Sequence, residues 1–322
     1  MILSLINGVY ICYICLLMLE KLYYRIAGHC LIIKTSNAEV TEDLLPTFRP
    51  FRLEQEEYKN ALFCFSGDAV IPLPSKEPDE TLVVDDATFA VYHNNGEITI
   101  SMTLGGKEQQ TGGTEHRIQI SANKKKVLSD LTLTTPYEEH FLTYLLRTAF
   151  GTTAAYHRTL KMHASVIKKD GRAVVFLGTS GTGKSTHSSL WLKHVPGSTL
   201  LNDDEPLVRL SDDGRVWVFG APWSGSTPCY RNKKAEVAAF VLLQQGPENK
   251  LAKLGALEAF KVLLQSAAVF RSGREHREHM VTLIYDILEK VSVYRLINRP
   301  DREAVQLTHS LLHTIHENED NR

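Results

Sequence analysis

The feature that most constrains the fold is a glycine-rich loop placed between an apolar strand pattern and a helical pattern. The run RAVVFL (172–177) is followed by the loop GTSGTGKS (178–185), which leads into a helical pattern, KSTHSSLWLKH (184–194). A strand that passes through a short glycine loop into a helix is the building unit of folds in which helices pack on a sheet. The sequence therefore predicts an α/β core in the second half of the chain.

The spacing inside this glycine loop fits G-x-x-x-x-G-K-[ST]. Glycines let the backbone curl so that successive N–H groups face inward around phosphate oxygens, and the following helix adds the positive end of its dipole. A lysine ammonium in this frame reaches the β and γ phosphates, and the next hydroxyl can ligate Mg²⁺. We therefore predict that a nucleotide binds through Gly178, Thr179, Ser180, Gly181, Thr182, Gly183, Lys184, Ser185 and Thr186.

Two further polar groups accompany the loop. Asn202-Asp203-Asp204-Glu205 follows the apolar run STLL, which we expect to form a strand next to residues 172–177. A carboxylate at the end of a neighbouring strand is where such a phosphate site needs its metal ligand, and the alternative is an ordinary acidic turn. His163 stands at the start of the strand pattern MHASVIK, where a lone histidine is more often structural. The loop 220–226, after the strand RVWVF, is a candidate substrate loop with an exposed aromatic residue, Trp223.

These residues together resemble the HPr kinase/phosphorylase and ATP-dependent phosphoenolpyruvate carboxykinase superfamily. Its members have a histidine on the strand before the loop, a loop of the form G-x-S-G-x-G-K-[ST], and an Asp-Asp pair on the next strand. Those features correspond here to His163, residues 178–185 and Asp203-Asp204. The resemblance implies an HPr kinase/PEP carboxykinase-like P-loop core with a mixed sheet over residues 136–316.

The resemblance also implies a reaction, namely transfer of a phosphoryl group from ATP with Mg²⁺ to a hydroxyl group. Lys184 would bridge the β and γ oxygens, while Ser185 and Asp203 organise the metal. Asp204 would orient or deprotonate the acceptor hydroxyl, and His163 would lie beside the transferred group. Two adjacent carboxylates can share such work, so the sequence leaves open which aspartate is the base and which is the metal ligand.

The chain departs from both families in the parts that handle the acceptor. Thr186 stands where HPr kinases commonly carry Glu, and their C-terminal Gly-rich, basic segment has no counterpart. The substrate-binding Arg and second-metal Lys and His of carboxykinases are also missing. We therefore predict a kinase whose acceptor is a small molecule or a protein serine, with ATP or GTP as donor. The alternatives are a nucleotide-binding regulatory module without turnover and a carboxykinase-like activity.

The first half of the chain predicts a smaller, β-rich domain over residues 20–135, so that the whole chain is of the α+β class. Short runs of β-branched and aromatic residues alternate there with turn formers. Asn94-Asn95-Gly96 lies between FAVYH and EITISM and predicts a hairpin with a type I′ turn. From Pro136 the apolar residues take helical spacing, which predicts a helix leading into the second domain.

Composition limits the classes of partner and compartment. Lys and Arg number 36 against 37 Asp and Glu, so the chain lacks the basic excess with which proteins neutralise a nucleic-acid duplex. Five cysteines at irregular spacing fit reduced thiols, which favours the cytoplasm. We predict a cytoplasmic protein that binds no nucleic acid, and the sequence leaves a homo-oligomer open.

The first 19 residues form the one apolar stretch that approaches the length needed to span a bilayer. Three interpretations compete for residues 1–19: an upstream extension from a misassigned start, a membrane anchor, and a buried strand or helix. We favour the extension, because the residues after Met18 read like the opening of a domain, and membrane association remains an alternative through this segment.

Overall fold

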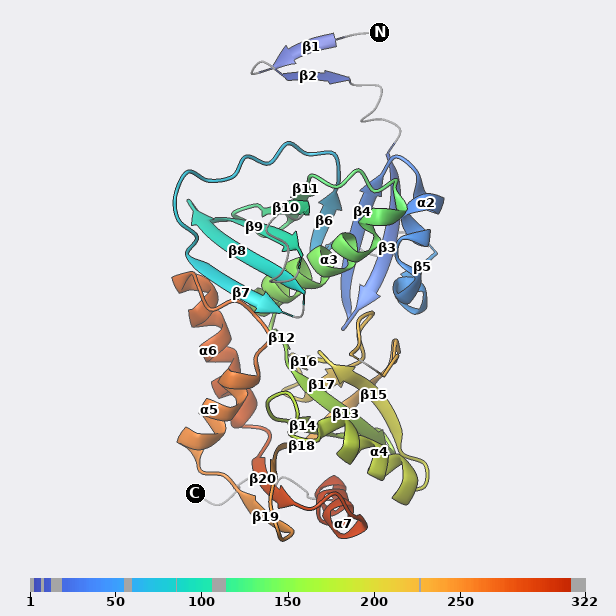
Figure 1. The fold of residues 1–322 in the computed structure, drawn as a ribbon, viewed down its shortest axis with the longest axis vertical. Coiled ribbons are helices and arrows are strands. Elements are labelled where there is room, and N and C mark those ends of the chain that lie inside the picture. Colours follow the sequence, from blue (N-terminus) through green and yellow to red (C-terminus); the bar gives the residue numbers. More distant parts are fainter. Residues whose placement is uncertain are drawn as a thin grey trace. The chain divides into compact units, whose positions relative to one another are not determined.

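The computed structural model describes residues 3–6, 9–12, 19–54, 60–84, 86–105, 114–225 and 227–313. The chain divides into two compact units, Met1–Phe150 and Gly151–Arg322, and each combines strands with helices (Figure 1). The architecture is therefore mixed α and β, with a mixed sheet in each unit, in agreement with the predicted α+β class. The predicted domain boundary at residue 136 stays a prediction.

The first unit is built on one mixed sheet of nine strands within the described residues. They are β3 (Glu20–Ile26), β4 (His29–Thr35), β5 (Arg52–Leu53), β6 (Phe63–Ser66), β7 (Glu80–Val84), β8 (Ala87–Asn94), β9 (Glu97–Leu104), β10 (Thr114–Ile120) and β11 (Lys126–Ser129). Their spatial order is β5-β3-β4-β6-β11-β10-β9-β8-β7. Only β6 runs parallel to its neighbours β4 and β11, and the other described pairs are antiparallel.

The N-terminal segment contributes a separate antiparallel pair, β1 (Leu3–Ile6) and β2 (Val9–Cys12). The remainder of the predicted extension or anchor, residues 1–2, 7–8 and 13–18, lies outside the described residues. Among the helices that the structure describes, none is both long enough and apolar enough to span a membrane.

The predicted hairpin is confirmed between β8 and β9. Asn94 pairs with Glu97, and both residues between them have positive φ, +48° at Asn95 and +81° at Gly96. This geometry is that of a type I′ turn, whose twist matches that of the flanking strands. Asn and Gly tolerate positive φ better than other residues, so the local sequence alone determines this connection.

The helical elements of the first unit are α2 (Ala38–Asp43), η1 (Pro46–Phe51), η2 (Pro136–Glu138) and the greater part of α3 (Glu139–Ala154). The helix predicted from Pro136 is confirmed, with a single 3₁₀ turn before the α-helix. Helix α3 lies across the sheet (Figure 1). Its Phe141 ring meets the His116 ring of β10 edge-on at 4.5 Å, and its Tyr144 ring stacks on Phe89 of β8 at 6.3 Å.

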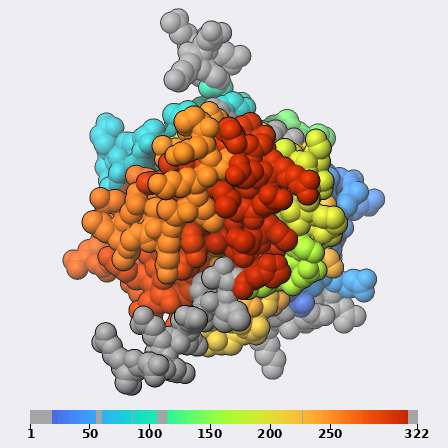
Figure 2. Space-filling model, turned by 90° about the horizontal axis from the view of Figure 1, so that it is seen from below, coloured from blue at the N-terminus to red at the C-terminus, as the bar shows by residue number. Residues whose placement is uncertain are grey.

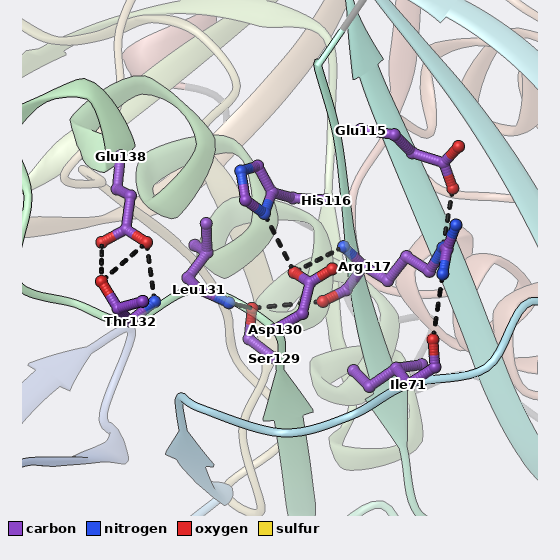
Figure 3. Close-up of polar contacts among 9 residues, drawn as sticks. All are labelled: Ile71, Glu115, His116, Arg117, Ser129, Asp130, Leu131, Thr132 and Glu138. Atoms are coloured by element: carbon purple, nitrogen blue, oxygen red, sulfur yellow. Dashed lines mark hydrogen bonds and ion pairs between the residues drawn. The ribbon is translucent and has the colours of Figure 1, made fainter.

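A buried carboxylate holds the turn that leads into α3 (Figure 3). Glu138 is fully buried and accepts hydrogen bonds from the Thr132 N–H at 2.6 Å and the Thr132 hydroxyl at 3.0 Å. The N–H groups of Thr134 and Thr135 add bonds of 3.2 and 3.4 Å. Burial would raise the pKa of Glu138, but these hydrogen bonds outweigh it and hold the pKa below its ordinary value.

A second polar group in Figure 3 joins β10 to the chain after β11. The Asp130 carboxylate accepts from the Arg117 N–H at 2.9 Å and lies 3.1 Å from His116 Nδ1. Ser129 Oγ donates to the Arg117 carbonyl at 3.2 Å, and Arg117 Nε donates to Glu115 at 2.7 Å. Side chains of Ser129 and Asp130 therefore bond the backbone of β10 at Arg117.

The sheet of the second unit is also mixed, and it positions the candidate site. Its described strands are β12 (Thr159–Lys161), β13 (Ala164–Lys169), β14 (Arg172–Leu177), β15 (Thr199–Asp204), β16 (Leu207–Leu210), β17 (Val216–Phe219), β18 (Lys234–Gln245), β19 (Lys250–Lys253) and β20 (Val293–Asn298). Seven of them follow the order β12-β16-β17-β18-β14-β13-β15, and β20 pairs with β18 and β19. Strands β14, β18 and β20 run parallel, whereas β13 runs antiparallel to both β14 and β15.

Helices cover both faces of this sheet. They are η3 (Ala155–His157), α4 (Lys184–His194), α5 (Ala256–Ser266), α6 (Arg274–Leu288), α7 (Arg302–Ser310) and η4 (Leu311–His313). Because side chains alternate along a strand, Val175 of β14 packs with the core of α5 and α6, while Phe176 packs with that of α4 and α7. In Figure 2 the red surface of the C-terminal elements adjoins the yellow-green surface of α4, and Trp191 Nε1 of α4 donates to Thr308 Oγ1 of α7 at 2.8 Å.

One expectation about strand order is wrong. The strand that ends in the acidic cluster, β15, does not lie next to β14, because β13 lies between them. Strand β13 joins β14 through a tight turn in which both Asp170 and Gly171 have positive φ, and the two strands pair as a hairpin. Within this hairpin, β13 pairs with the side of β14 to which β15 would have to bond if the two strands were neighbours.

Candidate functional site

Three segments that are far apart in the sequence meet at one edge of the second sheet. Ala164, the first residue of β13, pairs with Leu177 at the end of β14 and with Asp204 at the end of β15. Because β13 is antiparallel to both neighbours, its start lies level with their ends. Leu177, Ala164 and Asp204 therefore lie in one row across the three strands. His163 comes directly before Ala164 in the chain and Gly178 directly after Leu177, so both residues lie next to this row.

The glycine loop leads from β14 to the first residue of α4, Lys184. Gly178, Gly181 and Gly183 all have positive φ, at +146°, +81° and +98°. A Cβ on Gly181 or Gly183 would meet no atom within 4 Å, so backbone conformation rather than crowding requires glycine at these two positions. The first turn of α4 therefore faces open space. Its backbone N–H groups have no hydrogen-bond partners within the helix.

Lys184 is the cation of the site. Its Nζ donates to the carbonyl of Gly178 at 2.8 Å and to that of Thr179 at 3.2 Å, and it lies 2.9 Å from His163 Nε2. Burial lowers the pKa of Lys184 from its ordinary value, and the carboxylates of Asp204 and Asp203 act against that shift. The ammonium is therefore held inside the site by groups of its own chain.

His163 connects Lys184 to the acidic pair. A protonated lysine has donors only, so His163 Nε2 must accept, and the neutral ring then carries its proton on Nδ1. Nδ1 lies 3.3 Å from Asp204 Oδ1. The ring of His163 thus lies between an ammonium and a carboxylate.

The backbone of the acidic pair has an unusual conformation at its second residue, Asp204. Asp203 is buried and accepts a hydrogen bond from Ser185 Oγ at 3.2 Å. Asp204 has a backbone φ of +136°, which residues other than glycine rarely adopt. The Gly225 N–H donates to the Asp203 carbonyl at 2.6 Å. A Cβ on Gly225 would lie 3.2 Å from the Cβ of Asp204, so this loop closes tightly over the strained residue. Strain of this kind collects at functional sites.

Lys161, which no sequence motif singled out, and Glu205 of the acidic cluster support the end of β15. Lys161 and Glu205, both buried, form an ion pair of 2.7 Å. Trp223, expected to be exposed, is also buried, and its Nε1 donates to the Glu205 carbonyl at 2.8 Å. The candidate substrate loop therefore uses its aromatic residue to hold the acidic strand. Ser226 of this loop lies outside the described residues.

The site encloses a cavity of about 330 Å³. It is lined by His163, Ser180, Gly181, Gly183, Lys184, Ser185, Thr186, Asp203, Asp204 and Gly225. Three of the predicted loop residues do not line the cavity but support residues that do. Gly178 and Thr179 accept hydrogen bonds from Lys184 through their carbonyls, and the Thr182 hydroxyl donates to the Thr179 carbonyl at 2.9 Å. The structure thus brings the predicted residues together around one space.

Two of the lining residues offer oxygen atoms of the kind that Mg²⁺ binds. Among the described residues no group of three or more His, Cys, Asp and Glu could hold a metal by itself. Ser185 Oγ and Asp203 Oδ1 nevertheless offer two neighbouring oxygens at the cavity. Mg²⁺ commonly takes only one or two protein oxygens and completes its shell with water and phosphate oxygens. These residues could therefore hold Mg²⁺ that arrives with a phosphate ligand.

Comparison with known families concerns the part of the chain that carries this site. The family model of the SynChlorMet cassette protein ScmC matches residues 127–298, more than half of the chain. The chain belongs to the ScmC family. The ScmC match spans β13, the glycine loop and β15, so it includes every lining residue of the cavity. No curated protein matches the chain.

Proposed function

We propose that the chain binds a nucleoside triphosphate with Mg²⁺ and transfers its terminal phosphoryl group to a hydroxyl group. The observation that carries this proposal is the arrangement of Lys184, His163 and Asp204 in series around a cavity at the N-terminus of α4. A cation, free helix N–H groups and a carboxylate facing the same space are what phosphoryl transfer needs, since it depends on positioning and charge neutralisation.

The phosphate side of the site would act through the loop and Lys184. The N–H groups of the first turn of α4 bind phosphate oxygens, and Lys184 exchanges its bonds to the Gly178 and Thr179 carbonyls for bonds to the β and γ oxygens. Ser185 and Asp203 would hold Mg²⁺, which when bound supplies further positive charge to the phosphates. Gly181 and Gly183 leave the space that these phosphates require.

The acceptor side would depend on Asp204. An acceptor hydroxyl oxygen forms a bond to the γ phosphorus as the bond from that phosphorus to the β–γ bridging oxygen breaks, and the hydroxyl proton passes to Asp204. His163 Nδ1 lies 3.3 Å from Asp204 Oδ1 and would help to orient this carboxylate for the step. We also propose that the core is of the HPr kinase/PEP carboxykinase-like P-loop type, because its histidine, glycine loop and Asp-Asp pair share one cavity.

The test is transfer of radiolabelled γ-phosphate from ATP to a panel of hydroxylated small molecules and serine peptides, with binding followed by calorimetry. We expect Lys184→Ala to weaken binding of Mg·ATP and to remove transfer, because it deletes the cation on the phosphates. Lys193→Ala, which removes an exposed lysine at the far end of α4, is the control and should leave both unchanged. Equal ATP affinity in wild type and Lys184→Ala would overturn the proposal, and binding without transfer to any acceptor would favour the regulatory module.

A further inference from the structure

A second cavity adjoins the first at the N-terminus of α4. It has a volume of about 370 Å³ and is lined by Thr182, Gly183, Thr186, His187, Gln245, Gly246, Asn298, Arg299 and Pro300. Gly183 and Thr186 line both cavities. The two spaces therefore meet at the first turn of α4, and one extended ligand could occupy both.

Sheet topology places the second cavity where ligands are expected. Strands β14, β18 and β20 run parallel, so their carboxyl ends share one edge. The glycine loop follows β14, while Gln245 and Asn298 end β18 and β20 and pair with each other in register. In open sheets with helices on both faces, ligands bind in the crevice outside these carboxyl ends.

Two amide side chains in the second cavity keep hydrogen-bonding capacity. Gln245 Nε2 donates to the carbonyl of Gly181 at 3.1 Å, and Asn298 Nδ2 donates to that of Arg299 at 3.0 Å. Among the described residues, neither amide oxygen, Gln245 Oε1 or Asn298 Oδ1, accepts a hydrogen bond. Both can accept from a ligand that presents N–H or O–H groups, such as an exocyclic amine or a sugar hydroxyl.

The only cation that lines the second cavity, among the described residues, is already compensated. Arg299 Nε lies 3.1 Å from Asp301 Oδ2, and its Nη2 lies 3.2 Å from Glu303 Oε2. Its charge is therefore balanced by two carboxylates in direct contact with it. What remains for a ligand is the flat face of a guanidinium held in place, on which a planar ring can stack.

We propose that the second cavity binds the base and ribose of the nucleotide whose phosphates lie over the glycine loop. This inference rests on the proposed function and adds that the site selects nucleotides over bare polyphosphate. The charged part of the ligand meets Lys184, and the uncharged, planar part meets Asn298, Gln245 and Arg299. The cavity volume also falls within the roughly 300–1,000 Å³ of small-molecule sites.

The experiment compares tripolyphosphate, ATP and GTP, each with Mg²⁺, in calorimetric titrations of the full chain. We expect wild type to bind at least one nucleotide about tenfold or more tightly than tripolyphosphate. Asn298→Ala should weaken that nucleotide about five- to tenfold, as loss of one hydrogen bond does, and leave tripolyphosphate affinity unchanged. Arg299→Ala should act in the same direction by removing the stacking face.

The matched control is Gln244→Ala. Gln244 is an exposed amide next to Gln245 on β18, and its side chain points to the opposite face and does not line the cavity. It should leave all three affinities unchanged, and thermal unfolding curves verify that each variant is folded. If nucleotides bind no more tightly than tripolyphosphate, or if Asn298→Ala weakens both equally, this inference is overturned while the phosphate site stands. If wild type binds neither, the proposed function fails, and this inference fails with it.

Discussion

The two units each bury a carboxylate, but they treat it in opposite ways. Glu138 in the first unit accepts hydrogen bonds from Thr132, Thr134 and Thr135, all within six residues of it. Asp203 and Asp204 in the second unit face a cavity, and Asp204 sits on a backbone with positive φ. The Glu138 carboxylate is satisfied by its own turn, whereas Asp203 and Asp204 lie beside open space and Asp204 has a strained backbone.

This difference distinguishes stabilising polar groups from candidate functional ones. A buried carboxylate that is fully hydrogen-bonded contributes to the free energy of unfolding and has no capacity left for a ligand. A strained carboxylate beside a cation and a cavity persists only because the surrounding structure imposes it, which points to chemistry. Substitutions in the two places should therefore separate effects on stability from effects on activity.

Two histidines of the second unit also differ in their surroundings. His163 lines the first cavity and lies between Lys184 and Asp204. His187, one turn into α4, is buried with its Nε2 3.1 Å from Thr308 Oγ1 and its ring edge-on to Phe176 at 4.7 Å. Burial lowers the pKa of His187 to about 4, with no charged group contributing to the shift.

The largest effect is expected at Asp204. Asp204→Asn keeps the shape of the side chain and tolerates positive φ, so the protein should fold, but it removes the proposed base. Phosphoryl transfer should fall by about 10²–10⁴-fold, with binding of Mg·ATP unchanged or tighter because a negative charge has gone. Single-turnover kinetics and calorimetry measure the two quantities. Asp212→Asn, on an exposed turn, is the control. If Asp204→Asn transfers phosphate at the wild-type rate, Asp204 is not the base and the Asp203-Asp204 pair is a structural turn.

The next effect concerns pH and His187. Its pKa is about 4 in the folded chain against 6.5 when unfolded, so only the unfolded state takes up a proton as the pH falls from 6.5. The free energy of unfolding should therefore decrease by about 3 kcal/mol between pH 6.5 and 4 on account of this group. Urea unfolding at several pH values measures it. A variant with His187→Gln should show a shallower dependence over that range, and an unchanged slope would contradict the assignment.

The smallest effect is expected at Glu138. Glu138→Gln turns an acceptor into a donor opposite the Thr132 N–H and should cost about 1–3 kcal/mol of unfolding free energy, with nucleotide binding unaffected. Because the folded pKa of Glu138 is lowered, its contribution is present above the unfolded value of 4.5 and is lost as the pH falls through the folded pKa. Glu139→Gln, its exposed neighbour, should change stability by less than about 0.5 kcal/mol. A loss of nucleotide binding in Glu138→Gln would contradict the assignment of Glu138 to stability alone.

Local patterns were sufficient for the elements that carry the site. The strand predicted at residues 172–177 is β14, and the helix predicted after the loop begins at Lys184, as its pattern indicates. The type I′ turn at Asn95-Gly96 also follows from its own residues. In each case the deciding interactions, namely helix and strand periodicity and tolerance of positive φ, lie within a few residues of one another. The nucleotide, metal and acceptor assignments stay predictions.

By itself, the sequence determined the strand and the helix on either side of the glycine loop, the type I′ turn at Asn95-Gly96 and the helix that follows Pro136. It also determined which residues are candidates for the chemistry. Only the tertiary structure decided that β13 separates β14 from β15, that Trp223 is buried under the acidic strand, and that Asp204 takes a positive φ. It also brought Asn298 to the same sheet edge as the glycine loop. The physical reason is that strand order, burial and strain depend on contacts between residues far apart in the chain, and no local pattern records which distant segment occupies a given edge.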